Sequence, residues 1–86
     1  GPEVDFVLEE EEAYTPIEVK WTQTPTLKDA RHLISFMKEY PVKTQGFIVC
    51  QTTYPVALTD KILAIHWSDL AKILCNLRTN WFFLLC

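Results

Sequence analysis

The sequence predicts a small α/β domain with a mixed β-sheet flanked by helices. Two segments near the start, residues 3–9 and 15–21, alternate apolar with charged residues, as strands do. A segment with helical spacing follows at 26–40, and then a nearly continuous apolar run at 46–51 that is typical of a buried strand. Strand, helix and strand in this order predict a right-handed crossover between parallel strands. A chain of 86 residues is long enough for one domain, residues 1–86.

The first two strands are predicted to form an antiparallel hairpin over residues 3–21. Their apolar faces are formed by Val4, Phe6 and Leu8 in one strand and by Ile17, Val19 and Trp21 in the other. If both faces cover one core, Asp5, Glu18 and Lys20 share the opposite face, whether Asp5 pairs with Glu18 or with Lys20. A register shifted by one residue would bury these charges, so burial selects against it.

The remaining elements are a helix, two strands, a second helix and an apolar tail. Thr26 is a suitable N-cap, and Pro41 ends the first helix. Its apolar stripe consists of Leu27, Ala30, Leu33, Ile34, Met37 and Tyr40. Strands are expected at 46–51 and 62–65, and a helix at 68–77 with Ser68 as its cap. The tail, 78–86, is aromatic enough that it must cover the domain's own core or a partner's, for example in a homodimer.

Charge and cysteine content exclude several classes of protein. With a net charge of −3, binding of nucleic acid would need a local basic patch. The block Glu9–Glu12 is interpreted as a solvated hairpin tip, with a metal-binding or acidic recognition tip as alternatives. Three widely spaced cysteines lack the spacing of a zinc site and are expected to be buried free thiols. No signal peptide or membrane-spanning run is present, which predicts a cytoplasmic protein and no membrane partner.

The segments Glu3–Val7 (EVDFV) and Pro16–Lys20 (PIEVK) resemble the PD-(D/E)xK nuclease-like superfamily. They are more similar still to the domain of unknown function at the C-terminus of bacterial and archaeal P-loop ATPases. Thr26–Asp29 and Leu58–Ile65 resemble the usual continuation of that domain, so the likeness extends from Glu3 to about Trp67. The resemblance implies a restriction-endonuclease-like mixed sheet, here truncated at its N-terminus.

The resemblance also implies a metal site. Asp5, Glu18 and the backbone carbonyl of Val19 would bind Mg²⁺ or Mn²⁺, and no other cofactor is implied. Lys20 would orient or deprotonate the attacking water and stabilise charge on the scissile phosphate. Glu3 is either an acidic residue behind this site or a charge at the sheet edge. From spacing alone, Asp5, Glu18 and Lys20 could equally form a ladder of surface salt bridges.

Two functions therefore remain open. One is a metal-dependent endonuclease-like phosphodiesterase that acts on DNA as the C-terminal part of an ATPase, with the isolated fragment expected to be inactive. The P-loop domain, and the first helix and strand of the superfamily, have no counterpart in this sequence. The other is a non-catalytic interaction or dimerisation module with the same fold. Beyond these two, binding of DNA without cleavage is a third possibility, which the sparse lysines and arginines disfavour. His32, on the solvent side of its helix, and His66 are expected to have no catalytic role, Lys28 is expected to be solvated, and the three tryptophans are expected to pack in the core or an interface.

Overall fold

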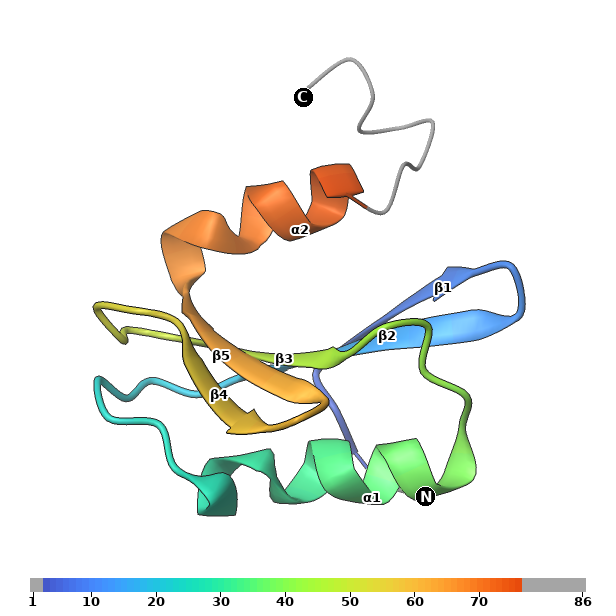
Figure 1. Ribbon diagram of the computed structural model, residues 1–86, viewed down its shortest axis with the longest axis horizontal. Helices are drawn as coiled ribbons and strands as arrows, with labels where there is room; N and C mark the ends of the chain where they lie inside the picture. Colours follow the sequence, from blue (N-terminus) through green and yellow to red (C-terminus); the bar gives the residue numbers. More distant parts are fainter. Residues whose placement is uncertain (1–2, 77–86) are drawn as a thin grey trace.

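The computed structural model describes residues 3–76, in which a five-stranded sheet lies between one helix on each face (Figure 1). The strands are β1 (Phe6–Glu10), β2 (Ala13–Val19), β3 (Gly46–Cys50), β4 (Val56–Thr59) and β5 (Ile62–His66). The helices are α1 (Arg31–Glu39) and α2 (Leu70–Asn76), each preceded by a 3-10 turn, η1 (Leu27–Ala30) and η2 (Trp67–Asp69). The predicted tail, 78–86, and residue 77 lie outside the described residues.

The sheet is mixed, as predicted, with strand order β1-β2-β3-β5-β4. β1 and β2 form the antiparallel hairpin, and β2 connects through α1 to β3, which runs parallel to it. β5 is parallel to β3, and β4 pairs antiparallel with β5 at the edge. The sequence did not predict β4. It has only four residues, follows Pro55 and is largely exposed, so it lacks the alternation that marks a half-buried strand.

Two clusters of apolar side chains form the core, one on each face of the sheet. The cluster under α1 contains Ala30, Leu33, Ile48, Cys50, Ile62 and Ala64. The cluster under α2 contains Ile17, Phe47, Val49 and Ile65, with Leu70 and Ile73 packed against it. Since β3 contributes side chains to both clusters, all five of its residues are buried, which confirms the prediction from its continuous apolar run.

The predicted distribution of buried and exposed residues along β2 is wrong. Four consecutive residues, from Thr15 to Glu18, are buried, because α1 and α2 cover both faces of this strand. Phe6, Val19 and Trp21 were expected to be buried, but they are exposed by 58%, 42% and 75%. The seven-residue α2 packs mainly over β3 and β5, which leaves the apolar side chains at this end of the hairpin uncovered (Figure 1).

Two other sequence expectations change in part. The N–H of Thr26 donates to the Asp29 carboxylate at 2.9 Å, which confirms the predicted capping of the first helical segment. His66, rather than Ser68, caps η2 by accepting the N–H of Ser68 at 3.1 Å.

Cys50 is a buried free thiol as expected, whereas Cys75 is disulfide-bonded, so the expectation is wrong there. Within residues 3–76 no helix has the length and apolar character needed to cross a membrane.

The acidic block forms the turn of the hairpin but is not uniformly solvated. Glu11 and Glu12 are exposed and occupy left-handed backbone conformations, with φ of 51° and 68°. Two residues with positive φ define the tight turn that matches the twist of a hairpin. Glu10 is instead half-buried and forms an ion pair with Lys43, at 2.7 Å between Oε1 and Nζ.

The turn predicts a stabilising substitution. Residues other than glycine and asparagine lose about 1 kcal/mol each in the left-handed region. Because the added flexibility of glycine in the unfolded chain offsets part of this, the double variant Glu11→Asn/Glu12→Gly should raise the free energy of unfolding by about 1 kcal/mol. Urea unfolding followed by circular dichroism measures this change. Glu11→Gln/Glu12→Gln removes the same charges without relieving the backbone, and equal stabilisation by this control would contradict the explanation.

Candidate metal and phosphate site

Asp5 is bound to the end of β2 by a hydrogen bond. Its Oδ2 accepts the backbone N–H of Val19 at 2.7 Å, just beyond the last pair of the β1–β2 ladder, Phe6 with Ile17. The same register, continued by one residue, places Asp5 opposite Glu18. Of the two pairings that the sequence left open, the structure therefore has Asp5 beside Glu18 rather than beside Lys20.

Glu18 is a buried carboxylate, with an exposed fraction of only 4%. Its neighbour across the sheet is Ile48, which belongs to the cluster under α1, so Glu18 points toward that helix. There Nδ1 of His32, in the first turn of α1, lies 3.1 Å from Oε2 of Glu18. Because the His32 side chain is still 40% exposed, it connects the buried carboxylate to the surface.

The surroundings shift the pKa values of the Asp5 and Glu18 carboxyl groups in opposite directions. The hydrogen bond from the Val19 N–H lowers the pKa of Asp5, with smaller contributions from Glu18 and from the charges of Lys20 and His32. Burial raises the pKa of Glu18, and the adjacent Asp5 raises it further. Asp5 therefore stays ionised to lower pH than Glu18 does, and Glu18 is the first of the two to take up a proton as pH falls. Acid–base pairs at functional sites show such a separation.

The predicted site residues lie around one open cleft of about 650 Å³. It is lined by Glu3, Val4, Asp5, Val7, Glu18, Val19, Lys20, His32, Phe36 and Tyr40. Asp5, Glu18 and Lys20 thus come together, and the exposed Glu3 lies in the same cleft. The carbonyl of Val19 leaves the strand on the same side as its N–H, and hence toward Asp5, because both groups of one strand residue point the same way.

These donors fit a hard cation and do not fit zinc. Within residues 3–76 no three or more His, Cys, Asp or Glu side chains are grouped to hold a metal ion. Two carboxylates and a carbonyl remain, and Mg²⁺ is usually bound by one or two carboxylates while water completes its octahedron. One oxygen of each carboxyl group already has a protein partner, the Val19 N–H for Asp5 and Nδ1 of His32 for Glu18. The two carboxyl groups are also hydrogen-bonded to each other, so a cation between them would replace this contact.

His32 is the site residue that the sequence did not identify. Its partner is on β2, fourteen positions away, and no local spacing relates a strand residue to a helix residue at that distance. The available signal was its position next to the apolar stripe of α1, since Phe36, four residues later, is buried and lines the same cleft. His66 has the structural role expected of it, through the cap of η2.

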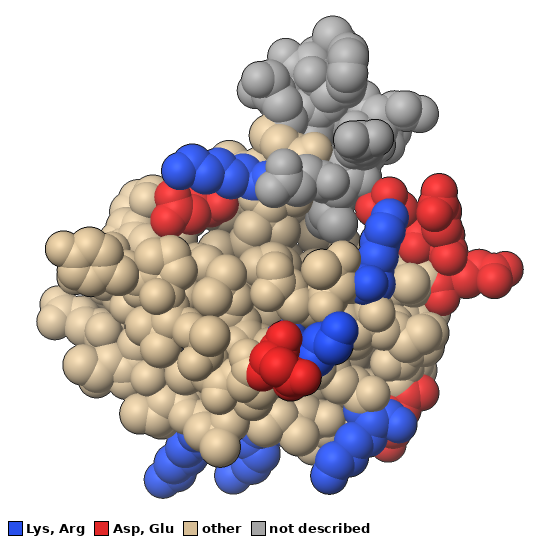
Figure 2. Space-filling view, in the orientation of Figure 1, with Lys and Arg blue, Asp and Glu red and all other residues tan. Residues whose placement is uncertain are grey.

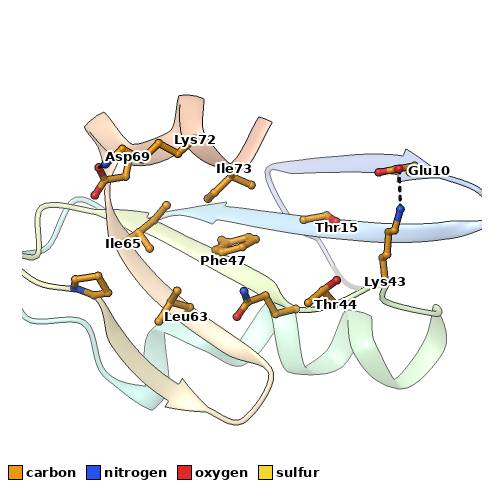
Figure 3. Close-up of a pocket in the computed structure, with 12 residues that line it drawn as sticks. Glu10, Thr15, Lys43, Thr44, Phe47, Leu63, Ile65, Asp69, Lys72 and Ile73 are labelled. Carbon is orange, nitrogen blue, oxygen red and sulfur yellow. Dashed lines mark ion pairs between the residues drawn. The ribbon is translucent and has the colours of Figure 1, made fainter. Parts of the chain in front are cut away.

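A second cavity, of about 470 Å³, lies on the opposite face between the sheet and α2 (Figure 3). Phe47, Ile65 and Ile73 form its apolar middle, and the Glu10–Lys43 ion pair closes one end. It contains none of the predicted site residues. The titratable side chains that line it form ion pairs with one another, Glu10 with Lys43 and Asp69 with Lys72.

Fold and site together define a small α/β domain with a mixed sheet and a carboxylate pair at the end of an inner strand. Residues 1–70 match the family described as a domain of unknown function, DUF4143, and the chain belongs to this family. This range agrees with the likeness noted from Glu3 to about Trp67. Searches of curated proteins and of solved structures found no match.

The raised pKa of Glu18 predicts a stability change that depends on pH. A carboxyl group whose pKa is higher in the folded than in the unfolded protein loses stabilisation as pH rises through the folded pKa. Without divalent cations, Glu18→Gln should therefore raise the free energy of unfolding by about 1 kcal/mol at pH 8, and by less as pH falls toward 4.5.

Urea titrations between pH 4.5 and 8 in the presence of a chelator measure this change. Glu9→Gln, on the exposed side of β1, is the matched control and should show no such pH dependence. A Glu18→Gln variant that is destabilised equally at every pH would show that the buried carboxylate is ionised and fully stabilised by its partners.

Proposed function

We propose that this chain is a metal-dependent, nuclease-like phosphodiesterase domain that acts on DNA in the cytoplasm as the C-terminal part of an ATPase. The observation that supports this most is the position of Asp5 beside Glu18, with Lys20 in the same open cleft. Two carboxylates and an ammonium group on a rigid sheet are the groups that phosphodiester hydrolysis needs.

Each side chain has a defined task in this mechanism. Asp5 and Glu18 would hold Mg²⁺ or Mn²⁺ together with the Val19 carbonyl, and the ion would supply Lewis-acid chemistry. Lys20 would orient the attacking water and balance the charge that develops on the phosphate. His32 keeps Oε2 of Glu18 in place and thereby orients the carboxyl group toward Asp5.

The charge distribution supports an anionic substrate near α1. Lys28 in η1 and Arg31 and Lys38 in α1 are exposed, and Figure 2 shows basic side chains along the lower edge of the molecule, where these elements lie. Acidic side chains gather instead at the hairpin end, over Glu9, Glu11 and Glu12. Lys28, Arg31 and Lys38 line a hollow separate from the cleft, on another face of the same helical segment, so a net acidic protein can still present a local positive surface to phosphate.

The proposal predicts that the two functions of the site can be separated. Asp5→Asn should abolish binding of Mn²⁺ or Mg²⁺, measured by calorimetry at millimolar ion. In the longer ATPase that the proposal implies, Lys20→Gln should retain metal binding but lower the rate of cleavage of a labelled DNA by at least about a hundredfold. Lys61→Gln, in the exposed β4–β5 turn, is the control and should change neither. Absence of metal binding by the unaltered protein at millimolar ion would refute the catalytic proposal.

A non-catalytic interaction module is the second candidate, and exposed side chains on β1 favour it. β1 is an edge strand, and Phe6 and Val7 are exposed by 58% and 42%. An edge strand with exposed apolar residues on both sides can pair with a second copy of the chain. The homodimer proposed through residues 78–86 rests on residues outside the described ones. Light scattering separates the candidates, since a monomer that binds metal would argue against the module.

A further inference from the structure

Three exposed aromatic side chains follow the ends of neighbouring strands. Trp21, Tyr54 and Trp67 are exposed by 75%, 76% and 54%, although the tryptophans were expected to be packed. Trp21 lies two residues beyond β2, Trp67 directly follows β5, and Tyr54 is in the connection from β3 to β4. Because β2, β3 and β5 run parallel, these positions share one edge of the sheet, which we call the aromatic edge.

The backbone that carries these residues is held by hydrogen bonds. The Lys20 N–H donates to the Val49 carbonyl at 3.0 Å, and the Gln51 N–H donates to the Thr22 carbonyl at 2.8 Å, so the loops after β2 and β3 are joined. The Thr52 hydroxyl donates to the Tyr54 carbonyl at 2.8 Å. The aromatic edge is therefore largely preorganised, which lowers the entropy lost when a ligand binds.

The Trp67 ring is also supported by a neighbour. It packs against the His66 ring with 5.2 Å between centroids and 35° between planes, while more than half of the residue remains exposed. Trp67 lies two strands away from Trp21 across the sheet, because β3 lies between β2 and β5. At the usual strand spacing, the backbones at the two positions are about 10 Å apart.

The surroundings of the aromatic edge are polar but carry little charge. The loop after β2 contributes the exposed Gln23 and Thr24, and the loop after β3 contributes Thr53. The outermost left margin of Figure 2 is uncharged, whereas a basic and an acidic side chain lie next to each other above it, toward α2. Lys20 directly precedes Trp21, and since side chains alternate along a strand, the two point to opposite faces of the sheet at the same strand end.

We propose that the aromatic edge is a stacking platform for unpaired bases of a nucleic-acid strand. Exposed aromatic rings with hydrogen-bonding side chains between them bind single strands. Every base has a π-face that can stack on a ring, and the flexible backbone of an unpaired strand lets the bases reach the rings. A duplex keeps its bases stacked within the helix and cannot use such a platform. The choice of nucleic acid over another polymer rests on the proposed function, but binding to these rings requires neither metal nor cleavage.

Fluorescence anisotropy with an end-labelled thymidine oligonucleotide of about twelve nucleotides tests this proposal. At low salt with a chelator present, Trp21→Ala and Trp67→Ala should each weaken binding by about fivefold or more, the lower end for loss of one stacked base. Trp21→Phe should retain most of the affinity. Glu9→Gln, near the hairpin turn, should bind like the unaltered protein, and the matching duplex should bind more weakly. Circular dichroism verifies that each variant is folded.

Each other outcome has a definite meaning. No oligonucleotide binding, or unchanged binding by both alanine variants, overturns the platform. A lower molar mass of these variants in light scattering overturns it too, since the rings would then form a protein interface. Ring-dependent binding by a protein that binds no metal at millimolar ion supports the platform while the phosphodiesterase proposal fails.

Discussion

The burial of Glu18 is the constraint on which the rest of the site depends. An ionised carboxylate inside a protein is costly unless it is paired or hydrogen-bonded, and β2 is covered by a helix on both faces. The hairpin register brings Asp5 to one side of it, and α1 brings His32 to the other. One buried side chain thus links two elements that are otherwise related only through the core.

The neighbouring carboxylates of Asp5 and Glu18 repel each other when both are ionised, and a cation bound between them would remove this repulsion. Asp5 is stabilised as an anion by the Val19 N–H, and its charge makes ionisation of Glu18 harder. A divalent cation between them would lower the free energy of both ionised carboxylates, so metal binding should strengthen as pH rises through the pKa of Glu18. Functional sites commonly sacrifice stability in this way, whereas a surface salt-bridge ladder would leave both carboxylates solvated and easily ionised.

The sequence predicted the elements better than their environments. Alternation defined the hairpin, and the apolar run at 46–51 defined β3, because these signals are local. Period-two alternation cannot tell whether one face of a strand is covered or both, so Glu18 was placed in solvent and Trp21 in the core. Glu18 is buried because α1 covers its face of β2, and Trp21 is exposed because α2 does not extend over it, and both depend on tertiary packing. The contact of His32 with Glu18 could not be predicted for the same reason, because it depends on how the crossover from β2 places α1 over the sheet.

The end of β2 then combines two kinds of surface within two residues. Lys20 lies in the cleft on the α1 side, and Trp21 is exposed among uncharged loops. In open sheets, the carboxyl ends of parallel strands are where ligands bind, because loops there can vary while the strands fix their starting points. In the proposed mechanism, a nucleic-acid strand that crosses this edge would place its bases against the rings and its phosphates beside the carboxylates. Alternation of side chains, which misled the assignment of burial, is what separates the two surfaces.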